Sequence, residues 1–263
     1  MEPPPVGLRA RELAVRALLR VEQEDAYLQL ALRGLLRRYQ ATPSQAALAT
    51  ALATGVLRWK SRLDFALEQV SRRPLCGVDP ALLQILRVAA YEVGFARETP
   101  APVAVDLAVR QARTLGRGPA SFANAVLRAL VRTADGELPA PPSGPLDVRL
   151  AITYAHPVWL VRRWMDRFGV STAEAILKAN NQPPGLAVRV NRLRTSPQQL
   201  GASWQAHGIE SQPGTLAPEA LVVDRSRTAV EALPGFDEGL FTPQSEASML
   251  PAHALQAGAG MLV

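Results

Sequence analysis

A ten-residue segment rich in proline and glycine, residues 136–145, divides this sequence into two halves of different character. Four of its residues are proline and two are glycine. Proline removes a backbone donor and fixes φ, so such a run sustains neither a helix interior nor a central strand. We therefore expect a stiff, extended linker here, with a separate domain on each side.

The first half carries the periodicity of helices throughout. Apolar residues recur every three or four positions from residue 10 to residue 132, and no strand pattern interrupts them. Thr42-Pro43 and Asp79-Pro80 each combine a capping side chain with proline at the first helical position, which is typical of a helix start. The pattern predicts an all-helical bundle of six or seven helices.

The second half mixes helical and strand patterns. Leu186, Val188 and Val190 alternate with Ala187 and Arg189, which is typical of a strand with one buried face. Helix-start signals and apolar runs place the remaining elements around this strand. The sequence predicts a small α/β module with helices over 157–168, 172–179 (capped by Thr172), 196–208 and 244–255 (kinked or interrupted at Pro251), and strands at 186–190 and 221–223.

The last residues, Gly258–Val263, have the pattern of a turn followed by the beginning of a buried strand. A short apolar run after a helix is typical of a parallel sheet, and cofactor sites lie beyond the carboxyl ends of such strands. We expect a further domain, holding a reaction centre, to begin here. The alternative is a short protein that ends in an apolar tail.

Charge is distributed unevenly between the halves. Residues 1–134 contain 19 Lys and Arg against 11 Asp and Glu, whereas residues 135–263 contain 10 against 12. Only Lys60 and Lys178 are lysines. Arginine suits phosphate because its planar guanidinium binds two oxygens at once. The basic first half indicates a nucleic-acid partner; a GC-rich genome would explain the preference for arginine, but not the difference between the halves.

Motifs for catalysis, cofactors and metals are not apparent. The sequence has neither a Gly-Lys-Ser/Thr phosphate loop nor a Gly-x-Gly-x-x-Gly pattern after a strand. Its three histidines are scattered, and Cys76 is alone, so no metal-ligand spacing and no disulfide is expected. We predict no catalytic, cofactor-binding or metal-binding residue in this chain. Without an uncharged stretch of membrane length or a signal-peptide pattern, a cytoplasmic protein is expected.

The candidate binding residues are basic and amide side chains grouped at helix ends and turns. Each alone is more often a solvated surface residue, but together they form a possible RNA-binding surface. Arg128 and Arg132 lie four apart, on one helix face. Asn124, within an apolar run, is either a structural hydrogen-bond partner or part of that surface, and Asn181 is rather a turn residue. The predicted RNA-binding residues are Arg9, Arg11, Arg58, Lys60, Arg62, Arg113, Arg117, Asn124, Arg128, Asn180, Arg189 and Asn191.

Two groups of motifs resemble known families. The first half resembles the NusB-like RNA-binding fold in the segments 55–58, 86–92, 102–112 and 121–128 (Ser-Phe-Ala-Asn-Ala-Val-Leu-Arg). The second half resembles bacterial 16S rRNA cytosine-5 methyltransferases of the RsmB (Sun/Fmu) family. Its motifs, in order, are His156–Leu160, Ala179–Pro184, Arg189–Asn191, Gly239–Gln244 and Ala247-Ser248. Ala123 and Asp106 depart conservatively from the family's usual Val and Glu.

The resemblance implies a three-part enzyme: a NusB-like helical bundle, a small α/β RNA-binding module and a Rossmann-like domain that binds S-adenosylmethionine. In that family a cysteine thiolate adds to C6 of cytosine, which activates C5 for methylation. Cys76 matches neither of the family's cysteines, and the cofactor loop would begin after Val263. Whether this chain is itself an enzyme is therefore open.

The expected organisation is a helical domain at 1–135, a linker at 136–145, an α/β module at 146–240 and the start of a methyltransferase domain at 241–263. The expected function is RNA binding for 16S rRNA methylation, with a possible ribosomal or transcription protein as a further partner. The alternative is a non-enzymatic NusB-type antitermination or ribosome-assembly factor. Residues 146–263 distinguish the two, because a pure NusB-like protein has no need of them.

Overall fold

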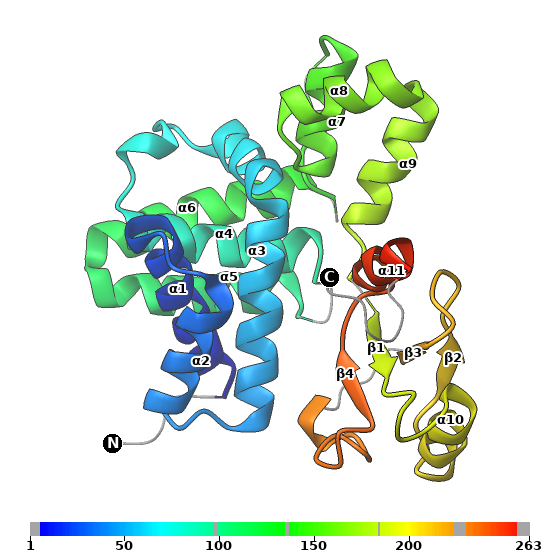
Figure 1. The fold of residues 1–263 in the computed structure, drawn as a ribbon. Coiled ribbons are helices and arrows are strands. Elements are labelled where there is room, and N and C mark those ends of the chain that lie inside the picture. Colours follow the sequence, from blue (N-terminus) through cyan, green and yellow to red (C-terminus); the bar gives the residue numbers. More distant parts are fainter. Residues whose placement is uncertain are drawn as a thin grey trace. The chain divides into compact units, whose positions relative to one another are not determined.

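The computed structural model describes residues 6–96, 99–134, 137–141, 143–183, 185–223 and 230–256. Contacts between residues divide the chain into two compact units, residues 1–181 and residues 182–263. The first unit is helical and the second contains the sheet (Figure 1). The helical first half and the small α/β second half were both predicted, and both are confirmed.

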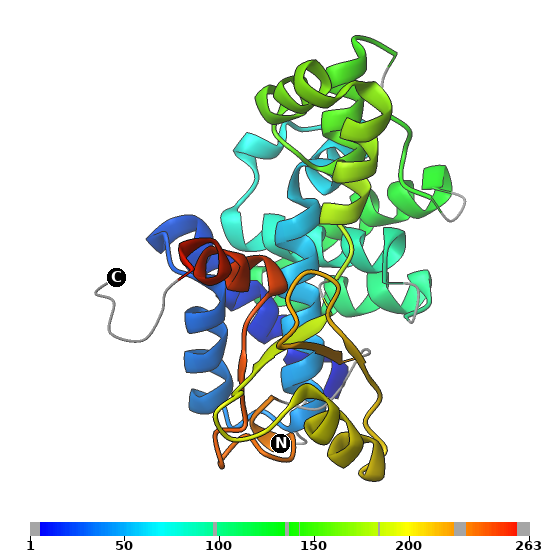
Figure 2. The same cartoon turned by 45° about the vertical axis from the view of Figure 1, so that its right-hand side comes forward.

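The first unit is built from helices, most of which are joined by connections of a few residues (Figures 1 and 2). Thr42 and Gln45 form a capping box at the start of the longest helix, and the Asp79 carboxylate caps another. The helices are α1 (Val6–Glu24), α2 (Leu28–Arg38), α3 (Pro43–Val70), α4 (Pro80–Gly94), α5 (Ala101–Ala112), α6 (Arg117–Ala134), α7 (Leu146–Tyr154), α8 (Val158–Phe168) and α9 (Val170–Asn180), with 3-10 turns η1 (Leu75–Gly77) and η2 (Arg113–Leu115).

Alanine and leucine fill the core of α1 to α6 with few aromatic rings. Small side chains let the helices approach closely. At Gly55 on α3 a Cβ atom would lie 2.1 Å from the Tyr91 ring on α4, so only glycine fits this contact. The helical pattern of the sequence therefore identifies the core, and the glycine sets the distance between two of its helices.

The linker segment does not behave as a free spacer in its described part. Leu138 is buried and packs against Gly94, and its carbonyl accepts a hydrogen bond of 3.0 Å from Nη2 of Arg62. The segment is therefore anchored to the helical unit and is not the spacer that was expected. Proline prevents helix and strand, but the leucine just before the first proline still has a place in the core.

Helices α7 to α9 form a separate small core of Leu150, Ala151, Val161 and Leu177. The prediction that Thr172 caps a helix is wrong, because α9 begins at Val170 and Thr172 lies inside it. Gly169, with φ of +78°, ends α8 and directly precedes α9. Contacts group α7 to α9 with the helical unit, whereas the α/β module was expected to begin at 146.

The second unit is a four-stranded antiparallel sheet in the order β2-β3-β1-β4. Its elements are β1 (Leu186–Val190), α10 (Pro197–Ala206), β2 (Ser211–Pro213), β3 (Ala220–Val223), the 3-10 turn η3 (Val230–Ala232), β4 (Phe241–Pro243) and α11 (Glu246–Leu255). The order of β1, α10, β2 and β3 is the beginning of a split β-α-β arrangement. The strands β2 and β4 were not predicted, because each has only three residues.

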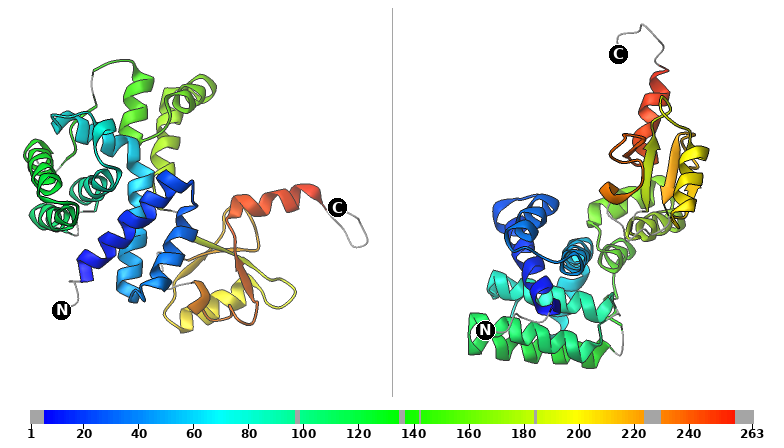
Figure 3. Two further views of the ribbon diagram at one scale, coloured as in Figure 1. Left: turned by 90° about the vertical axis from the view of Figure 1, so that its left-hand side faces the viewer. Right: turned by 90° about the horizontal axis from the view of Figure 1, so that it is seen from below.

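Helices lie against both faces of this sheet (Figure 3). Leu200 and Trp204 of α10 pack on Val188 and Val190, whereas Met249 of α11 packs on Ala217 and Ala220. Trp204 is fully buried, and its Nε1 donates to the carbonyl of Pro234 at 2.9 Å. Alternation along β1 therefore leaves Arg189 exposed on the face that α11 covers in part.

Residues 241–243 pair with β1, in register from Val190↔Phe241 to Val188↔Pro243. They belong to the sheet of the second unit, although they were expected to begin the next domain. Helix α11 continues through Pro251, so of the two expected effects of this proline, a kink or an interruption, the interruption does not occur. The strand predicted within Gly258–Val263 lies outside the described residues.

Candidate nucleic-acid interface

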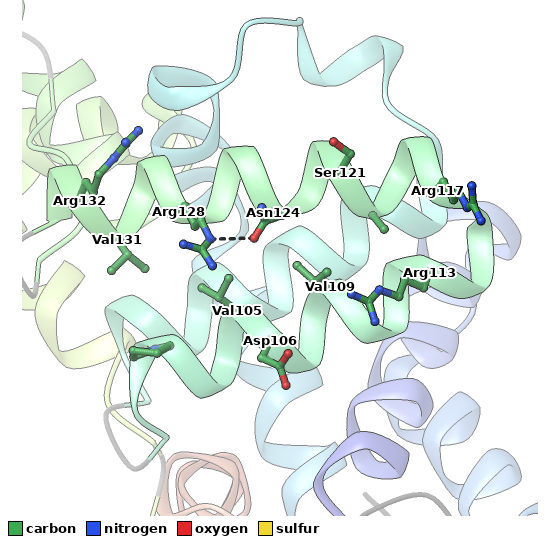
Figure 4. A pocket seen from close by; sticks show the side chains of 12 residues that line it. Val105, Asp106, Val109, Arg113, Arg117, Ser121, Asn124, Arg128, Val131 and Arg132 are labelled. Carbon is green, nitrogen blue, oxygen red and sulfur yellow. Dashed lines mark hydrogen bonds between the residues drawn. The ribbon is translucent and has the colours of Figure 1, made fainter.

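A basic hollow lies between α5 and α6, which are joined by η2 and run side by side (Figures 3 and 4). We call it the arginine pocket. It encloses about 890 Å³, and its lining residues are Pro102, Val105, Asp106, Val109, Arg113, Arg117, Ala120, Ser121, Asn124, Arg128, Val131 and Arg132.

Helical spacing brings the polar side chains of α6 to this pocket. Arg117, Ser121, Asn124, Arg128 and Arg132 follow one another at intervals of three or four residues, so they occupy one face. Arg113 comes from η2, before the turn at Gly116, whose φ of +123° favours glycine. Two consecutive elements, η2 and α6, therefore place their basic residues at one hollow.

The arginine pocket has an excess of positive charge. Four guanidinium groups line it, and the lining carboxylate, Asp106, pairs with Arg110 on the same helix at 2.8 Å. Among the described residues, none of the four lining arginines forms an ion pair with a carboxylate. Nε of Arg128 instead donates to Oδ1 of Asn124 at 2.9 Å (Figure 4). Such a cluster favours a bound anion.

Asn124 is half-buried and faces the pocket, where it orients Arg128. The sequence left two interpretations of this amide, a structural hydrogen-bond partner or a part of the binding surface. Both are compatible with its position in the structure. Val105, Val109 and Val131 provide apolar surface beside it. This surface lowers the local dielectric and strengthens the attraction of the guanidinium groups for an anion.

Two residues predicted to bind RNA are buried in structural interactions. Arg11 is 4 % exposed and makes a two-point contact with the carboxylate of Glu92, with Nε at 2.8 Å from Oε2. Arg62 is 8 % exposed and holds the Leu138 carbonyl. Their guanidinium groups are not presented to solvent, so both leave the set of candidate RNA contacts.

Three further predicted residues lie on the helical unit outside the arginine pocket. Arg9 pairs with Glu12 at 3.2 Å and covers the Tyr39 ring, with 4.6 Å from Cζ to the ring centroid. Lys60 pairs with Glu22 at 3.1 Å. Arg58 is half-buried. Of these three residues, Lys60 belongs to a network of Glu22, Asp64 and Arg87 that connects α1, α3 and α4.

Glu22 is the centre of that network. Burial acts to raise its pKa, but hydrogen bonds from Lys60 and the charge and hydrogen bonds of Arg87 outweigh burial, so its pKa lies below the ordinary value. Arg87 also binds Asp64, with Nε at 2.6 Å from Oδ1, and these carboxylates outweigh burial and raise its pKa. The network is a structural connection between helices.

In the second unit, Arg189 and Asn191 line a smaller hollow of about 390 Å³. Arg192, Glu219, Thr242 and His253 complete its described polar lining. Asn191 has a structural part as well, because its Nδ2 donates to the Gly239 carbonyl at 3.0 Å and its Oδ1 accepts from the Leu193 amide at 3.2 Å. Arg189 is exposed there.

Asn180 is exposed at the end of α9 and lines neither hollow. Its neighbour Asn181 is buried and donates from Nδ2 to the Tyr154 carbonyl at 2.8 Å, a structural hydrogen bond to a distant residue and not one within its own turn. Sequence analysis did not single out Ser121 or Arg192 as lining residues. Helical spacing from Asn124 would have found Ser121, whereas Arg192 reaches its hollow only through the sheet register.

No group of three or more metal-ligating side chains occurs within the described ranges. Helices long and apolar enough to cross a membrane are likewise not found in the part of the chain that the structure describes.

A site for S-adenosylmethionine, the methyl donor that the family implies, is not formed by the described residues. Such cofactors bind at the carboxyl ends of parallel strands with a glycine-rich turn. The strand pairings among the described residues are all antiparallel, and the turn predicted at Gly258–Gly260 lies outside the described residues. We therefore derive no methyl-transfer step from this chain.

Comparison with known proteins identifies both parts of the chain. Residues 8–132 match the NusB family, and residues 156–231 match the Methyltr_RsmF/B-like, ferredoxin-like domain. A probable ribosomal RNA small subunit methyltransferase B of Bacillus subtilis (strain 168) is 33 % identical over 93 % of this chain and 54 % of its own length. A protein of the same description from Synechocystis sp. is 27 % identical over 94 % of this chain and 55 % of its own.

Among solved structures, the crystal structure of PH0851 aligns with 99 % of this chain and 57 % of its own, with a TM-score of 0.69 at 19 % identity, a likeness of fold alone.

The domain combination defines the class, a NusB-family helical domain followed by the ferredoxin-like domain of RsmF/B-like methyltransferases. More narrowly, the relatives described as ribosomal RNA small subunit methyltransferase B share 27 to 33 % identity with more than nine tenths of this chain, which confirms the resemblance drawn from its motifs. It spans about half the length of the curated relatives it matches.

Proposed function

We propose that this chain is the RNA-recognition part of an S-adenosylmethionine-dependent 16S rRNA cytosine-C5 methyltransferase that acts in the cytoplasm, and that its arginine pocket binds the RNA backbone. The observation that carries the proposal is the convergence of Arg113, Arg117, Arg128 and Arg132 on one hollow. One guanidinium group can bind two oxygens of a phosphate at once. Phosphate contacts of this kind supply most of the affinity for RNA.

The other polar lining residues have a complementary part in this proposal. Oδ1 of Asn124 accepts the hydrogen bond from Nε of Arg128, so the two terminal nitrogens of this guanidinium remain for a phosphate group. Ser121 can donate or accept toward a ribose hydroxyl, because a hydroxyl does both. Pairing with Arg110 keeps Asp106 from repelling the RNA as strongly as a lone carboxylate would.

In the second unit, Arg189 and Asn191 are proposed as a further RNA contact. Asn180, at the end of α9 in the first unit, is proposed as a contact of its own. The methyl donor would supply the one-carbon group, and the residues of this chain would only hold the RNA.

The alternative is a NusB-type antitermination or ribosome-assembly factor that never methylates. The match of residues 156–231 to a methyltransferase-associated domain supports the enzyme's RNA-recognition part instead. A ribosomal or transcription protein as an additional partner is compatible with both.

Salt titration of RNA binding tests the proposal. Replacing Arg113, Arg117 and Arg128 together by Gln should weaken binding to a 16S rRNA transcript and flatten the dependence of log K on log salt. Each lost phosphate contact reduces that slope by about 0.7 to 0.9. Filter binding across ionic strengths measures this slope.

Arg33→Gln is the matched control, because Arg33 is exposed on α2 and does not line the pocket. A triple variant with the parent's slope would contradict the proposed interface. Equal affinity for 16S rRNA and for unrelated structured RNA of the same length would favour the alternative function.

A further inference from the structure

The exposed face of α8 combines aromatic and basic side chains. Trp159 is 63 % exposed and Phe168 is 45 % exposed, although both are large and apolar. Together with Leu160, Arg163, Trp164 and Arg167 they line a shallow hollow of about 250 Å³. The buried side of the helix is formed by Val161, so the tryptophan is not needed for the core.

Helical geometry explains the mixture. Trp159, Arg163 and Arg167 follow at intervals of four, and Leu160, Trp164 and Phe168 form the neighbouring row. An arginine therefore lies beside an aromatic ring along two turns of the helix. Cζ of Arg167 is 5.4 Å from the centroid of the Phe168 ring, which keeps this guanidinium over the aromatic surface.

Charge identifies the kind of partner that fits. The lining of the hollow contains two arginines and no carboxylate. Arg162, on the adjacent side, is neutralised by Asp147 at 2.6 Å, and Asp166 is exposed on the same helix but does not line the hollow. An apolar protein surface would leave Arg163 and Arg167 without counter-charges, whereas a polyanion with flat apolar groups would satisfy both kinds of side chain.

We propose that this face of α8 binds single-stranded RNA, with one base stacked on Trp159 and the flanking phosphates held by Arg163 and Arg167. The inference rests on the proposed RNA-binding function and adds the form of the ligand: an unpaired segment. Bases stack on exposed aromatic rings regardless of their identity, and nearby arginines bind the backbone.

Intrinsic fluorescence provides a direct test, because the other three tryptophans are less exposed than Trp159. Trp204 is fully buried, Trp164 is half-buried, and Trp59 is half-buried and stacked on Phe95 at 4.2 Å between ring centroids. A 12-nucleotide oligouridylate should quench the emission of the whole chain. Inorganic polyphosphate, which has charge but no bases, should bind without this quenching.

Trp159→Ala should abolish the quenching and weaken oligouridylate binding at least about fivefold, as expected for loss of one stacked base. Trp159→Phe should recover part of the affinity, since phenylalanine still stacks. Binding of an RNA duplex of the same length should change less than twofold in both variants, because its bases are not free to stack. Trp59→Phe is the matched control and should keep both quenching and affinity.

Two results would overturn the inference. The first is that Trp159→Ala binds oligouridylate as tightly as the parent, although the arginine-pocket triple variant still loses salt-sensitive binding. The proposed function would then stand without this contact. The other is Trp159 emission that acrylamide does not reach in the free protein, because this face would then be covered by protein. Failure of every RNA to bind would instead remove the proposed function itself.

Discussion

At the scale of single residues, burial separates arginines that the sequence presents as equivalent. Arg11 lies in the basic first half and was a candidate RNA contact, but it is 4 % exposed and binds Glu92, whose side chain is 1 % exposed. Arg128 has the same charge on a helix of similar composition, yet it is exposed and faces the arginine pocket. Whether a guanidinium group is buried against a carboxylate or exposed at the pocket therefore decides its role.

Arg11→Met should therefore destabilise the helical unit strongly while leaving the RNA contacts intact. Removal of one partner leaves the Glu92 carboxylate buried without its counter-charge, which costs about 3 to 5 kcal/mol. Urea unfolding measures this loss. The double change Arg11→Met with Glu92→Leu should restore most of the stability, and the folded double variant should bind RNA with the parent's salt slope. A stable single variant with weakened RNA binding would return Arg11 to the interface.

At the scale of elements, helix–helix distances depend on a few small residues and one anchored loop. Gly55 permits the close approach of α3 and α4 at Tyr91, and Gly94 leaves room for Leu138 from the proline-rich segment. Leu138 therefore joins the core of the helical unit although the sequence around it is that of a linker. The arginine pocket benefits from the same packing, because α4 supports both α5 and α6.

Leu138→Ala should lower the free energy of unfolding by about 2 to 5 kcal/mol, the usual cost of truncating a buried leucine. Leu30→Ala is the control, since Leu30 is 67 % exposed on α2 and its truncation should cost less than about 0.5 kcal/mol. Chemical denaturation followed by circular dichroism compares them. Equal effects of the two changes would show that the segment is not anchored in the core.

At the scale of the whole molecule, the described cores of the two units share no residue. The clusters of α1 to α6 and of α7 to α9 contain no residue beyond 181, and the sheet clusters contain none before 186. The arginine pocket and the aromatic face of α8 both lie in the first unit, and the Arg189 hollow lies in the second.

A fragment of residues 1–181 should accordingly fold by itself, with a cooperative thermal transition and a largely helical circular dichroism spectrum. It should retain most of the salt dependence of RNA binding, because the four pocket arginines are all present. Loss of cooperative unfolding, or of the salt dependence in a folded fragment, would show that the sheet unit completes the first unit or its RNA surface.

Sequence alone determined the helical first half, the sheet-containing second half, the helix starts at Thr42-Pro43 and Asp79-Pro80 and the likeness to known families, because these depend on local periodicity, cap chemistry and ordered motifs. The placement of Arg113, Arg117, Asn124 and Arg128 in one pocket, the burial of Arg11 and Arg62, and the pairing of residues 241–243 with β1 were decided only by the tertiary structure. Burial and strand pairing depend on contacts between residues far apart in the chain, and a local pattern carries no information about which distant side chain will meet it.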